Sequence, residues 1–268
     1  MKILVTGGLG YIGSHTVVAL QKKGHDVIII DNLSNSSIEV LEGITRITGK
    51  SPEFVQTDLR DKQELSHFFN QHRDIYGVIH FAAFKAVGES VEKPLDYYEN
   101  NVAALVYLLK EMNNLNHPKL IFSSSCTVYG QAETLPITEE APVQKANSPY
   151  GNTKQIDEEI IRDHLSSGAD LQAISLRYFN PIGAHPSGLL GENPRKKLTN
   201  IFPSIIDVCK GKKEYVEIYG NDYDTEDGSA KRDYIHVCDV ANAHFCALQK
   251  IHNVQHFENI NIGYGFGT

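Results

Sequence analysis

The sequence has few cysteines and no surplus of positive charge. Its 268 residues include four cysteines, Cys126, Cys209, Cys238 and Cys246, which are widely spaced and form no CxxC pair. We therefore expect free thiols in a reducing compartment rather than a disulfide framework. The 33 acidic residues outnumber the 25 basic ones, for a net charge of −8. This charge disfavours nucleic acid and acidic membranes as partners.

Long apolar segments are also missing. No apolar run reaches the roughly 18 residues that a membrane-spanning helix needs, and the first residues, MKILVTGG, begin a strand without an apolar leader. We therefore expect a cytoplasmic protein with no membrane association. The hydrophobic content of 41% is enough for a full core, and the length allows one large or two unequal domains.

Short strand-like runs alternate with amphipathic stretches through the first two-thirds of the chain. The runs are KILVT, DVIIID, GVIHFAA, KLIFSSS and AISLRYFN. Their continuous apolar character indicates strands buried on both faces, as in a parallel sheet covered by helices. Residues 1–178 are thus predicted to form a doubly wound parallel α/β domain of the Rossmann type. Residues 179–268 are less regular, with helix-like IFPSIIDVCKG and strand-like YVEIYG, and are predicted to form a smaller second domain.

A glycine pattern follows the first predicted strand. Gly7, Gly10 and Gly13 form GxxGxxG at the start of a predicted helix. In this context the glycines allow a tight turn, close approach of the backbone to a pyrophosphate, and packing of helix on strand. Asp31 ends the second predicted strand, where a carboxylate would bind an adenosine ribose and repel a 2′-phosphate. The pattern predicts an NAD site, with NAD favoured over NADP.

Two readings remain open for parts of this pattern. Asp58 and Leu59, after a third strand-like run, are candidates for the adenine edge, although Asp58 alone would serve equally well as a helix cap. The glycines and Asp31 could also form only a tight turn and a strand end, with no ligand.

A serine, a tyrosine and a lysine form the candidate catalytic group. Tyr150 and Lys154 are four residues apart in a predicted helix, with Ser148 as N-cap and Pro149 as first helical residue. They then share one helix face. A tyrosine base at neutral pH needs its pKa lowered by about three units, on the order of 4 kcal/mol. The nearby ammonium and the positive charge of an oxidised nicotinamide ring are expected to contribute. Ser125 ends a predicted strand at the edge of the sheet where ligands bind.

Taken together, these residues resemble a known family. The stretches VTGGLGYIGSHT, DNLSNS, HFAAFKAVGESVEKPLDYYENN, IFSSSCTVYG, SPYGNTK, LRYFNPIGAHPSG and YGNDYDTEDGSAKRDYIHV are similar to the extended short-chain dehydrogenases/reductases. Within that family the chain resembles the UDP-glucose 4-epimerases along its whole length. The resemblance implies the following cofactor contacts: Gly7, Gly10, Tyr11, Ile12, Gly13, Asp31, Asn32, Leu33, Ser34, Asn35, Ser36, Asp58, Leu59, Phe81, Ala82, Ala83, Phe84, Lys85, Asn100, Ser125, Tyr150, Lys154 and Phe179.

The same resemblance implies a UDP-hexose substrate and a homodimer. The implied substrate contacts are Lys85, Ser125, Tyr150, Asn180, Asn200, Glu217, Ile218, Tyr219 and Arg232. In the implied reaction Tyr150 takes the proton of the sugar 4-hydroxyl while the hydrogen on carbon 4 passes to NAD, and the resulting 4-keto sugar is reduced on its other face. Ser125 is followed by Cys126 and Thr127 rather than by an Asp-Glu pair, so the elimination chemistry of related dehydratases is not expected.

Other functions stay open at this stage. Members of the family usually continue further, so the resemblance implies that the substrate domain is incomplete and that the chain could be a catalytically inactive NAD-binding protein. Another nucleotide sugar, such as a UDP-N-acetylhexosamine or a UDP-uronate, could be the substrate, and a scaffold without cofactor is a third hypothesis. No metal site is predicted, because DYDTEDG departs from the calcium-loop pattern. His80 is expected in the core.

Overall fold

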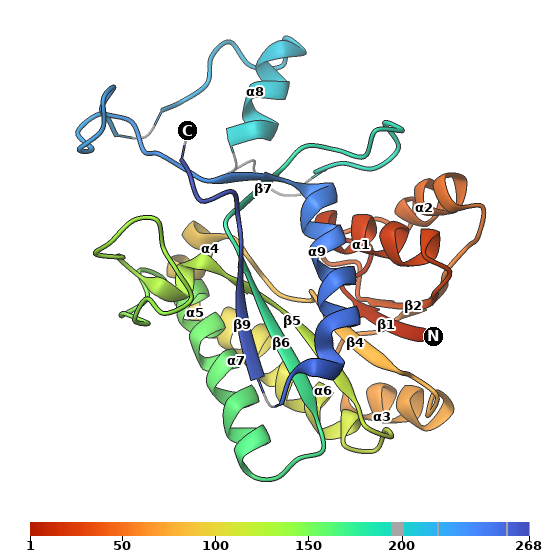
Figure 1. The fold of residues 1–268 in the computed structure, drawn as a ribbon. Coiled ribbons are helices and arrows are strands. Elements are labelled where there is room, and N and C mark those ends of the chain that lie inside the picture. Colours follow the sequence, from red (N-terminus) through yellow and green to blue (C-terminus); the bar gives the residue numbers. More distant parts are fainter. Residues whose placement is uncertain (194–200, 219, 256, 268) are drawn as a thin grey trace.

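A seven-stranded sheet forms the centre of the molecule (Figure 1). The structure is a computed structural model that describes residues 1–193, 201–218, 220–255 and 257–267. The strand order is β3-β2-β1-β4-β5-β6-β9, and every neighbouring pair is parallel. The strands are β1 (Lys2–Thr6), β2 (Asp26–Asp31), β3 (Glu53–Gln56), β4 (Gly77–His80), β5 (Lys119–Ser125), β6 (Gln172–Tyr178) and β9 (Phe257–Ile262). The predicted doubly wound parallel sheet is confirmed.

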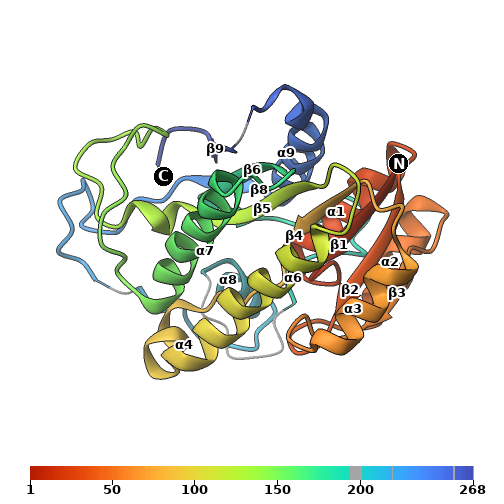
Figure 2. The same cartoon turned by 90° about the horizontal axis from the view of Figure 1, so that it is seen from below.

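Helices cover both faces of this sheet (Figure 2). Successive strand residues point to opposite faces, and consecutive Ile3, Leu4 and Val5 of β1 are all 0% exposed. Ile3 and Val5 pack in one apolar cluster and Leu4 in the other. This explains why the strand sequences are apolar throughout. One face carries α1 (Tyr11–Lys22), α2 (Val40–Thr48) and α9 (Val237–Lys250), and the other carries α3 (Lys62–Gln71), α6 (Ala104–Met112) and α7 (Pro149–Ser166).

Short elements complete the chain. They are α4 (Val87–Glu92), α5 (Pro94–Tyr97), a π-helix η1 (Tyr98–Ala103), two 3-10 turns, η2 (Cys126–Tyr129) and η3 (Ile251–Asn253), and α8 (Ile201–Cys209). A separate two-stranded parallel sheet joins β7 (Asn180–Ile182) to β8 (Tyr234–His236). None of the helices in the described ranges is long and apolar enough to span a membrane.

The second part of the chain differs from the sequence prediction in two ways. Helix α9 and strand β9, which the sequence assigns to the second domain, return to the first sheet, because α9 packs on α1 and β9 pairs with β6. The division at residue 178 stays a prediction. Residues 215–218, predicted as a strand, have no regular structure. Tyr215 and Ile218 are exposed there, and none of the strands in the described ranges pairs with this segment.

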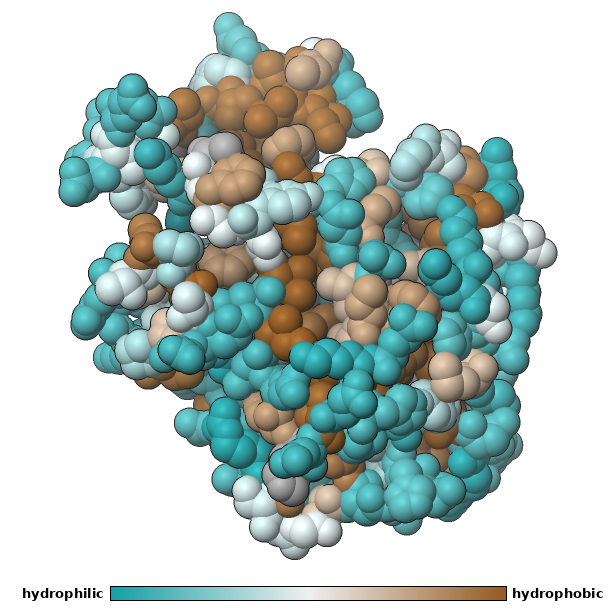
Figure 3. Space-filling view, viewed as in Figure 1, coloured by the Kyte–Doolittle hydropathy of each residue, from teal (hydrophilic) through white to brown (hydrophobic). Residues whose placement is uncertain are grey.

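Helix α8 stands outside both cores. Figure 1 shows it above β7, and the space-filling view shows apolar side chains gathered over it (Figure 3). Ile201, Ile205 and Ile206 are exposed, and none of them belongs to either apolar cluster. The helix predicted for this segment is confirmed, but it is not anchored by the main core.

The strand order reverses next to β1. The chain builds outward from β1 to β2 and β3, then crosses to β4 on the other side of β1. In sheets of this type, a crevice opens beyond the carboxyl ends of the two strands at the reversal. The loops after β1, β2 and β4 therefore meet at one place, and they carry most of the residues predicted to bind a cofactor.

Candidate active site

A pocket of about 520 Å³ lies at this crevice, within the range typical of small-molecule sites. It joins the glycine pattern at one end of the chain to the tyrosine and lysine of α7. Every predicted cofactor residue lines it except Leu33, Ser125 and Phe179. The pocket therefore brings together residues that are up to 147 positions apart between Gly7 and Lys154.

The glycines form a turn that side chains could not fit. Gly7 has a φ of +67°, and a Cβ on it would lie 2.8 Å from the backbone nitrogen of Ala82. A Cβ on Gly13 would lie 2.3 Å from the carbonyl oxygen of Gly7. Gly10 caps α1 without a side-chain hydrogen bond. The N–H groups of the first helical turn, which have no intrahelical partner, are thus unshielded by a capping side chain and suited to an anion.

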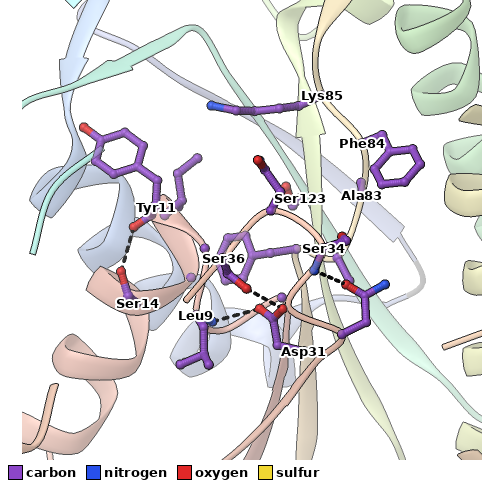
Figure 4. A pocket seen from close by; sticks show the side chains of 18 of the residues that line it. Leu9, Tyr11, Ser14, Asp31, Ser34, Ser36, Ala83, Phe84, Lys85 and Ser123 are labelled. Atoms are coloured by element: carbon purple, nitrogen blue, oxygen red, sulfur yellow. Dashed lines mark hydrogen bonds between the residues drawn. The ribbon is translucent and has the colours of Figure 1, made fainter. Parts of the chain in front are cut away.

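Asp31 holds the glycine turn against the next loop (Figure 4). Its Oδ2 accepts a hydrogen bond from the backbone N–H of Leu9 at 3.1 Å. Its Oδ1 accepts from Leu33 N at 2.9 Å and from Ser36 Oγ at 2.7 Å. A carboxylate offers about four acceptor positions, so about one remains for a ligand hydroxyl. Asp31 thus has a structural role that the sequence did not indicate.

Asp58 and Leu59 line the same end of the pocket. Arg60 donates to both oxygens of Asp58 at 2.9 Å, and Asn32 Nδ2 donates to Oδ2 at 2.9 Å. These bonds, with Arg60 the main cause, hold the pKa of Asp58 well below its usual range. The acid is therefore charged and fixed in orientation. The sequence pattern gave no signal for Arg60.

At the other end of the pocket, α7 begins as predicted. Ser148 is its N-cap and accepts a hydrogen bond from Gly151 N at 3.1 Å, and Pro149 is the first helical residue. Tyr150 and Lys154 both reach the pocket from this helix. Lys154 is buried, with its Nζ 4.6 Å from the ring centre of Phe122. The predicted helix face is confirmed.

The protein by itself does not lower the pKa of the candidate base. Burial raises the pKa of Tyr150 to about 12, with Cys126 and Asp157 acting in the same direction and a hydrogen bond from Ser125 opposing them. Burial also lowers the pKa of Lys154. The expectation from sequence took the ammonium and an oxidised nicotinamide ring into account but not the burial of both groups. A further positive charge must be bound nearby for Tyr150 to act as a base near neutral pH.

A buried ion pair fixes α7 to the sheet. Glu158, one turn beyond Lys154, accepts from Arg177 Nε of β6 at 2.9 Å and from Ser124 Oγ of β5 at 2.6 Å. Arg177 also donates to the hydroxyl of Tyr129 at 2.9 Å. Both charged side chains are at most 3% exposed. This network was not predicted, because residues 19 positions apart gave no spacing signal.

The pocket wall also includes residues that were not predicted, among them two with hydroxyl groups. Ser123 and Tyr178 line the pocket between the two ends, and their hydroxyls are hydrogen bonded to each other. They come from β5 and β6, where the sequence indicated only strand residues. At the opposite rim, Lys85 forms an ion pair with Glu192 at 3.1 Å.

The predicted substrate residues outside this set are not gathered in the pocket. Asn180, Glu217, Ile218 and Arg232 do not line it, and Asn200 and Tyr219 lie outside the described residues. Asn180 bonds through N and Nδ2 to the carbonyl of Asp233, at 3.0 and 3.1 Å. His80 lies in the core as expected, 2% exposed and bonded to Thr6 Oγ1 at 2.8 Å.

Comparison with known proteins identifies the family to which the chain belongs. Residues 3–263 match the model of the NAD dependent epimerase/dehydratase family. The chain belongs to this family. The pocket can therefore be compared with those of other members of this family.

Several relatives that match the whole chain are UDP-glucose 4-epimerases. The chain is 49% identical to a UDP-glucose 4-epimerase of Yersinia enterocolitica, over 100% of this chain and 79% of the relative. It superposes with a TM-score of 0.96 and 46% identity on the UDP-glucose 4-epimerase of Bifidobacterium longum in complex with NAD+ and UDP. The enzyme of Stenotrophomonas maltophila, with bound NAD and formylated UDP-arabinopyranose, gives 0.94 and 46%. Each structural match covers 100% of this chain and 79% of the other.

Proposed function

We propose that this chain is an NAD-dependent epimerase that interconverts UDP-galactose and UDP-glucose at carbon 4 of the sugar. One observation carries the proposal: Tyr150 and Lys154 open into the same pocket as the glycine turn and Asp31. Family membership and the UDP-glucose 4-epimerases named above support the choice of reaction.

The residues present fit NAD. Asp31 and Asp58 would hold the adenosine end, and the unshielded N-terminus of α1 would receive the pyrophosphate. Gly7 lets the turn pack on the backbone of Ala82, which lines the same pocket, at a position where a side chain would not fit. The nicotinamide would then lie towards Tyr150 and Lys154. When bound, NAD accepts and returns a hydride and brings a positive charge.

The chain's own residues move and hold the proton. Tyr150 would take the proton of the sugar 4-hydroxyl as general base and return it as general acid. Ser125 would hydrogen-bond the same hydroxyl, and the Lys154 ammonium would stabilise the phenolate. With its pKa raised to about 12, Tyr150 remains protonated until ligand charge is bound. This arrangement ties proton transfer to the loaded pocket.

The residues beside Ser125 favour epimerisation over dehydration. Cys126 follows it, and burial raises the pKa of this thiol to about 11, with a hydrogen bond from Ser125 opposing. A neutral thiol is not a general base at neutral pH. The residues at this point therefore support proton exchange at one hydroxyl and give no second base for elimination.

The substrate assignment is also part of the proposal. Asn180, Asn200, the stretch 217–219 and Arg232 would bind the UDP-sugar, with Lys85 near its phosphates. Lys85 forms an ion pair with Glu192. The phosphates of the UDP-sugar would therefore compete with Glu192 for the Lys85 ammonium.

To test the proposal, the protein is incubated with NAD and UDP-galactose, and the formation of UDP-glucose is measured by chromatography. Product is expected with the native chain and not with Tyr150→Phe, while both bind NAD. A panel with UDP-N-acetylglucosamine and a UDP-uronate distinguishes other epimerases. Stabilisation by NAD without turnover of any sugar would refute the proposal and favour a catalytically inactive NAD-binding protein.

A homodimer in a reducing compartment such as the cytoplasm completes the proposal. The four cysteines are free thiols, which suits such a compartment. Val87, Val91 and Leu95 on α4 and α5 are 50%, 62% and 78% exposed, and a second copy would cover them. Sedimentation at several concentrations tests this, with a dimer expected for the native chain and a weaker one for Leu95→Lys.

A further inference from the structure

An acidic side chain that is not part of the pocket lies behind its lysine. Asp157 is on α7, three residues after Lys154, and the two share a helix face. It is 1% exposed, and its Oδ1 has no hydrogen-bond partner among the described residues. It does not line the pocket. Burying a polar atom without a partner costs stability, so packing alone does not account for this residue.

Asp157 acts on the site through its charge. Burial lowers the pKa of Lys154, and Asp157, followed by Glu158, opposes this effect. Asp157 also contributes to the raised pKa of Tyr150. No ion pair joins Asp157 to Lys154 in the part of the chain that the structure describes, but charges interact more strongly in a buried medium than in water.

The neighbouring carboxylate is already compensated. Glu158 accepts hydrogen bonds from Ser124, Ser175 and both nitrogens of the Arg177 side chain that reach it. Because the charge of Glu158 is largely balanced by Arg177, its electrostatic interaction with another cation is weaker. Asp157 has no comparable partner within the described ranges, and of the two acids its charge has the larger effect on the pKa of Lys154, which burial lowers.

We propose that Asp157 is a positioning residue that keeps the Lys154 ammonium charged and so sets the upper end of the pH range in which Tyr150 exchanges a proton with the sugar. The catalytic part of this inference rests on the proposed function, whereas the charge coupling between Asp157 and Lys154 does not. Burial raises the pKa of Asp157 to about 7. Its negative charge is therefore gained near neutrality, and above that pH it opposes the effect of burial on the pKa of Lys154.

Other ionisable groups surround α7. On the helix itself, Lys154 and Glu158 act on Asp157, and Asp157 acts on Tyr150. Burial and the charge of Lys154 lower the pKa of His80 of β4. The groups on elements packed against α7 are Glu89 of α4, Tyr97 of α5, Tyr98 of η1, Cys126 and Tyr129 of η2, and Arg177 of β6.

The first experiment measures Lys154 without cofactor or substrate. The protein is labelled with ¹³C at lysine Cε and titrated by NMR, and the Lys154 signal is assigned by its loss in Lys154→Met. In Asp157→Asn the pKa of Lys154 should fall by about one unit or more. Asp157→Glu should retain most of the native value. Asp163→Asn, an exposed acid on the same helix, is the matched control and should leave it unchanged.

An unchanged Lys154 titration in Asp157→Asn would overturn the inference. If the asparagine variant does not fold, Asp157→Leu removes the charge without leaving an unpaired amide, and the same comparison applies. The Lys154 titration tests the coupling between Asp157 and Lys154 even if the native chain converts no UDP-galactose. In that case only the proposed function fails.

The second experiment is the pH profile of kcat/KM for UDP-galactose. The alkaline limb should move to lower pH in Asp157→Asn by about one unit or more, and Asp163→Asn should superpose on the native profile. A loss of activity with no displacement of the alkaline limb would show a purely structural role and would also overturn the inference.

Discussion

Replacing Asp157 with asparagine should change how the stability of the protein depends on pH. Burial raises the pKa of this acid from 3.8 to about 7. The unfolded chain loses the proton near pH 4, whereas the folded protein keeps it until about pH 7. The folded state therefore becomes less stable relative to the unfolded state as the pH rises between these values. A difference of about three units corresponds to roughly 4 kcal/mol.

Buried histidines act in the opposite direction. Burial lowers the pKa of His15 and His244 to about 4 and that of His80 to about 3. These side chains are charged in the unfolded chain below about pH 6.5 and neutral in the folded protein, so they reduce stability as the pH falls. The native profile contains both effects. The difference between the native chain and Asp157→Asn isolates the acid, because both proteins retain the histidines.

The assay is urea unfolding of the two proteins between about pH 4.5 and pH 8. The free energy of unfolding of Asp157→Asn should rise relative to that of the native chain as the pH increases, by roughly 3 kcal/mol over this range. Asp163→Asn, on the exposed side of the helix, should run parallel to the native chain. A constant difference between Asp157→Asn and the native chain at every pH would refute the reasoning.

Three further substitutions test the geometry. In Gly13→Ala the new Cβ would lie 2.3 Å from the carbonyl oxygen of Gly7. NAD binding measured by calorimetry should therefore be lost, and the free energy of unfolding should fall by about 1–3 kcal/mol. The control Gly88→Ala, with open space around its Cβ, should bind NAD normally. Ser148→Ala removes the N-cap of α7 and should cost about 1 kcal/mol in urea unfolding. Arg177→Met leaves Glu158 without its partner and should cost about 3–5 kcal/mol; a native-like unfolding midpoint would contradict that ion pair.

Much of the first sheet could be predicted, because local patterns specify it. The run DVIIID predicts a strand ending at Asp31, and β2 ends there. Ser148 and Pro149 mark the start of α7 through local capping, which needs no distant contact. The glycine turn is also local, and its strand-turn-helix context was sufficient to place it.

Features that depend on distant contacts could not be predicted in this way. The pairing of β9 with β6 joins residues about 85 positions apart, and the pair Glu158 and Arg177 forms only once α7 packs on β6. The raised pKa of Tyr150 follows from burial, which spacing does not reveal. In contrast, YVEIYG has strand propensity but no partner strand among the described residues, and propensity alone does not form a sheet.

The central claim is that Tyr150 and Lys154 serve one pocket in which the hydrogen on carbon 4 of the sugar is removed and returned. The most direct measurement uses UDP-galactose with deuterium at carbon 4, converted in ordinary water and analysed by mass spectrometry and NMR. We expect UDP-glucose that retains the deuterium at carbon 4, and no product from Tyr150→Phe. UDP-glucose with hydrogen from water at that carbon, or equal conversion by Tyr150→Phe, would contradict the claim.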